Sequence, residues 1–185
     1  LNNIFCYNSH MSNISHTKII PYQSDWPRRF LVEKESLQKV FGGTALEIEH
    51  IGSTSIEGLS SKPIIDIVVM IENHENANAF ADGLAQMGYK FHSASTERLF
   101  YTKGDPIEYH LSIAYANRGG FWPRQILFRD YLRTHPDVRD EYAKLKNDLL
   151  QKDPTGSDGY IAGKTEFVQG ILKQAGLKEN QMYKD

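Results

Sequence analysis

The stretch HIGSTSIEGLSSKPIIDIVVMI, residues 50–71, joins a turn rich in glycine and serine to an apolar run that contains one acid. Residues 64–71 are typical of a β-strand buried on both faces, and Asp66 lies inside it. An ionised carboxylate in an apolar core costs on the order of several kcal/mol unless it is paired or bound to a metal. The role of Asp66 is therefore the first question that the sequence raises.

The turn before this strand is suited to binding an anion. Gly52 has no β-carbon, so a ligand or another backbone segment can approach it closely. Ser53, Thr54 and Ser55 offer hydroxyls and backbone N–H groups that can form an anion-binding nest. Lys62 can add positive charge near the same point. In the functional interpretation the turn holds nucleotide phosphates and the following acid holds a divalent metal. In the structural alternative the acid accepts N–H groups from the turn.

The segments before this strand predict a helix and a first strand. Residues 24–41 have helical apolar spacing, with Ser24 as the expected cap. Residues 45–51 alternate apolar and polar positions, which predicts a strand with Leu46 and His50 on one face.

The rest of the chain predicts an α+β domain. A helix is expected over residues 76–87 and ends at a glycine. Three more strands are expected at residues 89–93, 98–103 and 107–115. Three helices follow, at residues 121–133, 137–151 and 160–175. The predicted architecture is a mixed sheet of about five strands with flanking helices and a helical C-terminal third.

The composition is that of an ordinary globular protein. The length of 185 residues predicts one domain over residues 18–185, and the polar, aperiodic residues 1–17 are interpreted as an extension with little fold content. The net charge of −2 disfavours duplex nucleic acid as a partner. Cys6 is the only cysteine, which fits a reducing, cytoplasmic location. Neither a membrane span nor a signal peptide is expected.

The run EHIGSTSIEGLSSKPIIDI resembles the signature of the GrpB family, which belongs to the nucleotidyltransferase-fold superfamily. PYQSDWPRRFLVEKESL before it, and ERLFYTKGDP, YHLSI and LFRDYLRTHPDVRDEYAKLK after it, resemble other blocks of the family in the same order. The resemblance implies a nucleotidyltransferase-like α+β fold for nearly the whole domain. Some GrpB-type domains are fused to dephospho-coenzyme A kinase, which implies a role near nucleotide or coenzyme metabolism.

The resemblance also implies a metal site. Nucleotidyltransferases of this superfamily carry a Gly-Ser or Gly-Gly turn, two acids alternating on one strand and often a third acid on a later strand, and the acids hold two divalent ions. Gly52 and Ser53 match the turn, and Asp66 matches the first acid. The second acid belongs two residues further on, where this chain has Val68. Loss of that carboxylate is expected to weaken Mg²⁺ binding strongly.

The strand at residues 107–115 offers a partial replacement. Glu108, His110 and Ser112 alternate onto one face, so Glu108 and His110 are expected to join Asp66 as catalytic residues. His110 and His50 are the expected metal ligands beside Asp66. The expected cofactor is a divalent ion, Mg²⁺ or Mn²⁺, with Zn²⁺ as an alternative because imidazole ligands favour it. Alternatively, each histidine is a core residue that bonds to a backbone carbonyl.

Basic residues are expected around the phosphates. Arg98 and Lys103 lie on the hairpin next to His110 and are predicted to bind a triphosphate. Arginines four residues apart on a helix are more often solvated or paired within the helix. Four further basic candidates lie in the helical third: Arg129, Arg133, Lys146 and Lys164.

The leading functional prediction is a metal-dependent enzyme that binds a nucleotide at the Gly-Ser turn and transfers a nucleotidyl or phosphoryl group to a small acceptor. The alternative is a catalytically inactive nucleotide-binding or regulatory domain that lost its second acid at Val68. A hydrolase built on Asp66 and His110 lacks a credible nucleophile. Convergence of Asp66, Glu108 and His110 in an open cleft would favour the enzyme.

Overall fold

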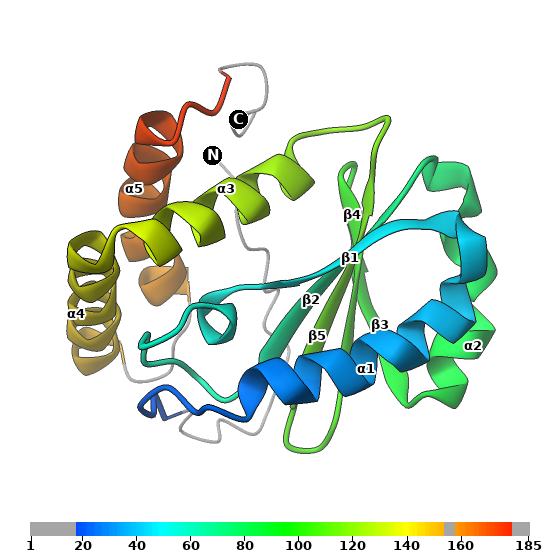
Figure 1. The fold of residues 1–185 in the computed structure, drawn as a ribbon, viewed down its shortest axis with the longest axis horizontal. Coiled ribbons are helices and arrows are strands. Elements are labelled where there is room, and N and C mark those ends of the chain that lie inside the picture. Colours follow the sequence, from blue (N-terminus) through cyan, green and yellow to red (C-terminus); the bar gives the residue numbers. More distant parts are fainter. Residues whose placement is uncertain (1–17, 154–157, 179–185) are drawn as a thin grey trace.

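The computed structural model describes residues 18–153 and 158–178, which form a β-sheet flanked by helices and followed by a group of helices (Figure 1). The strands are β1 (Ala45–Ile51), β2 (Ile65–Ile71), β3 (Tyr89–Ala94), β4 (Arg98–Lys103) and β5 (Tyr109–Tyr115). The α-helices are α1 (Trp26–Phe41), α2 (Ala81–Gln86), α3 (Phe121–Thr134), α4 (Pro136–Lys152) and α5 (Asp158–Gln174). The predicted extension, residues 1–17, lies outside the described residues.

The five strands form one mixed sheet in the order β1-β2-β5-β4-β3. β2 and β5 are parallel, whereas the other neighbours are antiparallel. β2 is therefore an inner strand, as its apolar sequence predicted. The mixed five-stranded sheet and the helical C-terminal third are both confirmed.

Strand pairing places alternate residues on two faces of the sheet. Asp66 lies opposite Ile51 on β1 and opposite His110 on β5, so these three residues share one face. Val68 and Ser112 form the next pair on that face. We call it the open face, because a third of the Asp66 side chain (33%) is exposed there. The opposite face is called the core face.

Helix α1 covers the core face. Its residues Phe30, Leu37 and Phe41 pack with Ile67 of β2 and Leu111 of β5 in the largest apolar cluster. Figure 1 shows α1 and α3 on opposite sides of the sheet. Burial of this apolar surface holds α1 against the strands.

Three local predictions are wrong. Asp25, rather than Ser24, occupies the N-cap of α1, and no side chain caps it. A bulge between Ala45 and Glu47 turns Leu46 outward, so it does not share a face with His50. Residues 74–80 form a 3₁₀ helix before α2, where several asparagines disfavour the α-helix.

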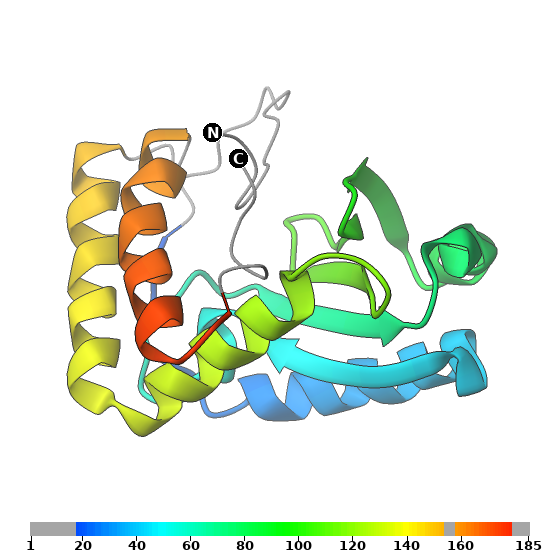
Figure 2. The ribbon, with the colours of Figure 1, turned by 90° about the horizontal axis from the view of Figure 1, so that it is seen from above.

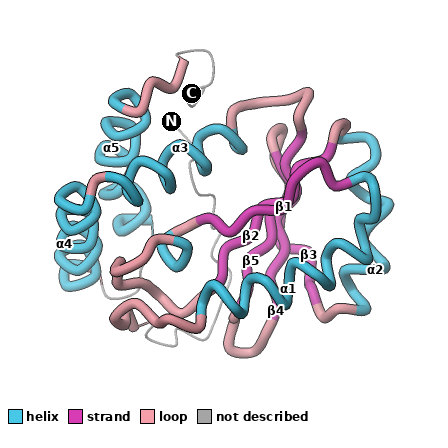
Figure 3. Tube along the Cα trace, in the orientation of Figure 1, coloured by secondary structure: helices cyan, strands magenta, loops and turns pink. Residues whose placement is uncertain are grey.

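The helical third packs against the long loop between β1 and β2. Figure 2 shows α4 and α5 side by side at one end of the sheet, and Figure 3 shows the loop extending toward them. Ile56 and Leu59 of this loop pack with Leu132 of α3, Tyr142 of α4 and Leu172 of α5. The C-terminal helices therefore fix the loop that carries the Gly-Ser turn. None of the described helices is both long and apolar enough to cross a membrane.

Candidate functional site

Asp66 and His110 form the centre of the site on the open face. His110 Nδ1 lies 2.9 Å from Asp66 Oδ1. The carboxylate can only accept, so His110 donates through Nδ1–H, which fixes the orientation of its ring. The ring of Phe100 packs edge-on at 5.2 Å between centroids. The Asp66 side chain bonds to this imidazole while about a third of it remains exposed to solvent.

Gly52 brings the backbone of the turn directly onto Asp66. Its φ of 68° and ψ of −176° are favourable only for glycine. A β-carbon at this position would lie 2.8 Å from Asp66 Cγ, which is too close for any side chain. The Ser55 hydroxyl then donates to the Gly52 carbonyl at 2.6 Å and closes the turn. The predicted close approach at Gly52 is to the carboxylate of this chain.

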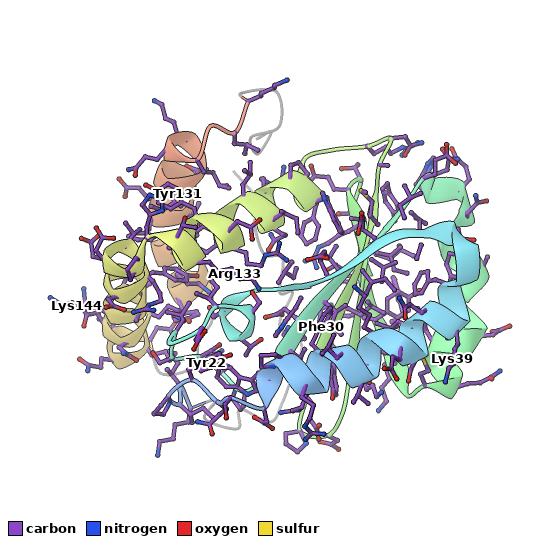
Figure 4. The ribbon with its side chains drawn as sticks, in the orientation of Figure 1. Tyr22, Phe30, Lys39, Tyr131, Arg133 and Lys144 are labelled. Atoms are coloured by element: carbon purple, nitrogen blue, oxygen red, sulfur yellow. The ribbon has the colours of Figure 1, made fainter. Side chains whose placement is uncertain are left out.

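Arginines of the helical third bind the backbone of the loop. The Arg133 guanidinium donates to the Ser55 carbonyl at 2.8 and 3.1 Å, and Figure 4 shows its place between α3 and the loop. Arg129 donates to the His50 carbonyl at 3.0 Å and to Glu49 at 2.6 Å. Both arginines also pair with Asp130 of α3, at 2.7 and 3.5 Å, so the predicted pairing within the helix is confirmed. Their role in positioning the loop was not predicted.

Three lysines meet beside the loop, and we call Lys62, Lys146 and Lys164 the lysine cluster. Lys146 Nζ, on α4, lies 3.1 Å from Ser53 Oγ and 2.6 Å from the Ser60 carbonyl. Lys62 Nζ, on the loop, and Lys164 Nζ, on α5, lie 5.3 and 4.0 Å from the centroid of the Tyr160 ring. Three separate segments of the chain therefore bring ammonium groups to one place.

Burial lowers the pKa of each lysine in the cluster. Burial and the neighbouring Lys164 lower the pKa of Lys146 to about 7, although the negative charge of Asp66 acts to raise it. Burial and Lys62 lower the pKa of Lys164 to about 8, again opposed by Asp66. Burial also lowers the pKa of Lys62, which both Asp66 and Asp153 oppose. Asp66 is therefore a counter-charge common to the three lysines, with Asp153 acting on Lys62 as well.

Arg98 lies further along the open face. Its guanidinium stacks against the rings of Phe100 and Phe121, at 4.5 and 4.7 Å, and donates to Ser112 Oγ at 2.6 Å. Arg98 is thus on the expected face. Lys103 is not: its ammonium lies 2.7 Å from buried Glu33 under the core face. Positions five apart on a strand point to opposite faces, so Arg98 and Lys103 cannot flank one ligand.

Four further expected residues are directed elsewhere. Glu108 precedes β5, is 55% exposed and pairs with Arg29 of α1 at 3.2 Å, so it does not approach Asp66. His50 lies on the core face with its Nε2 3.0 Å from the Thr54 hydroxyl. That hydroxyl donates to the Ile64 carbonyl at 3.1 Å, so His50 Nε2 carries the proton. The turn hydroxyls of Thr54 and Ser55 therefore hold the loop, whereas that of Ser53 contacts the lysine cluster.

His50 is a neutral core histidine. Its ring stacks on Phe30 at 4.9 Å between centroids, and Figure 4 shows Phe30 on α1 next to the sheet. Burial lowers its pKa to about 4, although Asp66 opposes this shift. The expected convergence of His50 on Asp66 as a metal ligand is not observed.

The donor set does not fit the two-ion arrangement of the superfamily. Within residues 18–153 and 158–178, no three histidine, cysteine, aspartate or glutamate side chains are grouped to share a metal. The position of the second acid is filled by Val68, which is fully buried and packs with Phe121 of α3. Asp66 and His110 are the expected ligands that do meet, and a metal bound to them stays a prediction.

Sequence reasoning missed one residue on this face and underrated two others. His92 of β3 lies near Phe100, and its pKa is lowered, mainly by burial and to a smaller extent by the neighbouring His110 and Arg98. Lys146 and Lys164 lie in segments that resemble blocks of the family, but the sequence did not predict that they meet, because only the packing of α4 and α5 brings them to the loop. The burial of lysines on amphipathic helices was the available signal, and it is weak, since long lysine stems often cover apolar surface.

Comparison with known proteins places these residues in a family. Residues 16–174 match the family model described as GrpB protein. The chain belongs to the GrpB family. The UPF0157 protein YqkA of Bacillus subtilis is 36% identical over 160 residues, which are 85% of this chain and 47% of that protein. The chain thus spans about half the length of this GrpB relative.

Solved structures extend the comparison to the fold. The conserved protein GrpB from Enterococcus faecalis has a TM-score of 0.79 at 31% identity, covering 85% of this chain and 96% of that one. A Cid1 poly(U) polymerase structure has a TM-score of 0.55 at 13% identity, covering 80% of this chain and 50% of that one. The second likeness concerns the fold alone. Together they confirm the predicted α+β, nucleotidyltransferase-like fold.

Proposed function

We propose that this GrpB domain binds a nucleotide, or another phosphorylated small molecule, with the phosphate chain beside Ser53 and the lysine cluster. The observation that carries the proposal is the meeting of three lysines from three segments of the chain beside the Ser53 hydroxyl and Asp66. Buried like charges destabilise one another, and a multiply charged anion relieves that repulsion. Lysine binds phosphate as a point charge.

The enzymatic form of this proposal is transfer of a nucleotidyl or phosphoryl group to a hydroxyl of a small acceptor. The acceptor oxygen forms a bond to phosphorus while the bond to the leaving phosphate breaks. His110, oriented by Asp66, takes the proton of the hydroxyl, and the lysine cluster stabilises the negative charge of the leaving phosphate. The imidazole and carboxylate at 2.9 Å support these roles.

A second candidate is a domain that binds the nucleotide without reacting it. Val68, buried beneath Phe121, favours this candidate, because no carboxylate can reach the site from the position where the superfamily places its second acid. Release of pyrophosphate or of a nucleoside diphosphate in the presence of acceptor hydroxyls distinguishes the two. Binding without release would favour the second candidate.

Nucleotide binding is tested by isothermal titration calorimetry with ATP, GTP, CTP and UTP. The informative variant is Lys146→Gln, and the matched control is Lys144→Gln, two residues away on α4, where the side chain is exposed (Figure 4). We expect at least one nucleotide to bind, and we expect Lys146→Gln to raise Kd roughly tenfold or more, since one charge near a phosphate is worth about 1.4 kcal/mol or more. Lys144→Gln should leave Kd unchanged.

Two results would contradict this proposal. One is the absence of binding by all four nucleotides with the folded protein. The other is an equal effect of Lys146→Gln and Lys144→Gln, which would show that the buried lysine does not contact the ligand.

A further inference from the structure

We infer that the site takes the polyphosphate chain free of divalent ions, with the lysine cluster supplying the positive charge. This inference deepens the proposed function and rests on it, because the same loop and lysines hold the ligand. It reverses the expectation that Asp66 attracts the ligand through a metal. In the inferred site Asp66 instead repels the phosphates and balances the charge of the empty cluster.

Asp66 is a poor ligand for Mg²⁺ in this arrangement. Its Oδ1 accepts the bond from His110 Nδ1 at 2.9 Å, and the Gly52 backbone covers the carboxylate so closely that no β-carbon fits there. The neighbouring position on the same face is apolar Val68. At phosphate sites Mg²⁺ keeps several waters and is held by one or two carboxylates plus substrate phosphates. Asp66 offers that ion one carboxylate, which is partly covered and already bonded to an imidazole.

Basic side chains are concentrated at the loop. Lys146 Nζ lies 3.1 Å from Ser53 Oγ, and Lys62 Nζ and Lys164 Nζ lie 5.3 and 4.0 Å from the centroid of the Tyr160 ring. A nucleoside triphosphate carries about two more negative charges without Mg²⁺ than with it, so a cationic site suits the free form better. The Lys146 ammonium lies on the side of the loop where Ser53 directs its hydroxyl.

The lysines of the cluster are held in place by contacts within the protein. Lys146 is 3% exposed, and two of its contacts, to Ser53 Oγ and the Ser60 carbonyl, hold its ammonium against the loop. Lys164 and Lys62 are held over the Tyr160 ring. Preorganised ammonium groups lose little side-chain entropy when an anion binds, which favours affinity. Lysines that merely covered the surface would not be fixed in this way.

The experiment is calorimetric titration with inorganic tripolyphosphate and with the four nucleoside triphosphates, in EDTA and in excess Mg²⁺. The inference predicts a Kd in EDTA equal to or lower than that in Mg²⁺. It also predicts that Asp66→Asn lowers Kd in EDTA by about 3- to 10-fold, because a negative charge near the phosphates is removed. Asparagine keeps the size of Asp66 and the oxygen that accepts from His110. Asp82→Asn, at an exposed position of α2, is the control and should leave Kd unchanged.

A second variant keeps the test decisive if Asp66→Asn does not fold. Lys164→Gln should raise Kd in EDTA roughly tenfold, and it should do so for tripolyphosphate as well as for nucleotides, because both carry the same phosphate chain. The thermal unfolding midpoint of each variant verifies that the protein is folded at the temperature of the titration.

The outcomes separate this inference from the proposed function. Binding of a nucleotide only when Mg²⁺ is present, with loss of binding in Asp66→Asn, overturns the inference and leaves the proposed function standing. Binding of tripolyphosphate in EDTA without any nucleotide supports the metal-free phosphate site and contradicts nucleotide as its ligand. Absence of binding for every ligand in both buffers overturns both.

Discussion

The two faces of the sheet treat buried charge differently. On the core face Lys103 pairs with Glu33, and His50 bonds to Thr54. Around the open face three lysines share the carboxylate of Asp66. Polar groups paired one to one within the fold contribute to stability, whereas like charges gathered at one place, with lowered pKa values, indicate a ligand site.

The largest effect is expected on the core face from Lys103→Met. The variant leaves the Glu33 carboxylate buried without its partner, since only 7% of that side chain is exposed. Removing one member of a buried ion pair costs about 3–5 kcal/mol of unfolding free energy. Urea denaturation would measure the loss.

The double variant Glu33→Leu/Lys103→Met is the control for this prediction. It replaces both charges by apolar groups and should recover most of the lost stability. A loss below about 1 kcal/mol in Lys103→Met alone would mean that Lys103 and Glu33 behave as a solvent-exposed ion pair rather than a buried one.

Gly52→Ala tests the contact between the Gly-Ser turn and Asp66. Its backbone conformation strains any other residue, and the added methyl group collides with Asp66, so we expect a loss of about 2–4 kcal/mol and a loss of phosphate binding. Gly43→Ala is the matched control, because a β-carbon there meets no atom within 4 Å. Equal unfolding free energies for the two variants would show that the turn does not press on the carboxylate.

The acid sensitivity of His50 gives a smaller effect. Its pKa is lowered from 6.5 in the unfolded chain to about 4 in the folded protein, so the unfolded state binds the proton first. Stability is therefore complete above pH 6.5 and falls by about 2–3 kcal/mol as the pH approaches 4. Chemical denaturation across this range should show that drop in the native protein and a smaller one in His50→Gln. Identical pH profiles would contradict the assignment of a neutral, buried imidazole.

The sequence predicted the fold because its signals were local and repeated. Apolar alternation marked the strands, and the run around Gly52 and Asp66 carried the family resemblance. The bulge that exposes Leu46 had no such signal, since its position depends on pairing with β2. The assignment of Lys103 to the site failed for a reason already present in the sequence, namely its odd spacing from Arg98.

The candidate site was predicted only in part. The meeting of Asp66 with His110 followed from their places on neighbouring strands. Glu108 does not join the site because β5 begins at Tyr109, one residue after it, and the Glu108 side chain pairs with Arg29 of α1. The lysine cluster depends on how two distant helices fold back onto the loop, and spacing along the chain carries no information about that contact.

The central claim is that the open face is a phosphate site built from the lysine cluster. A crystal structure with a non-hydrolysable ATP analogue tests it most directly. The account predicts phosphate oxygens within hydrogen-bond distance of Lys146 and Lys164, beside Ser53. A phosphate chain bound elsewhere, for example at Arg98, or no bound nucleotide at saturating concentration, would contradict it.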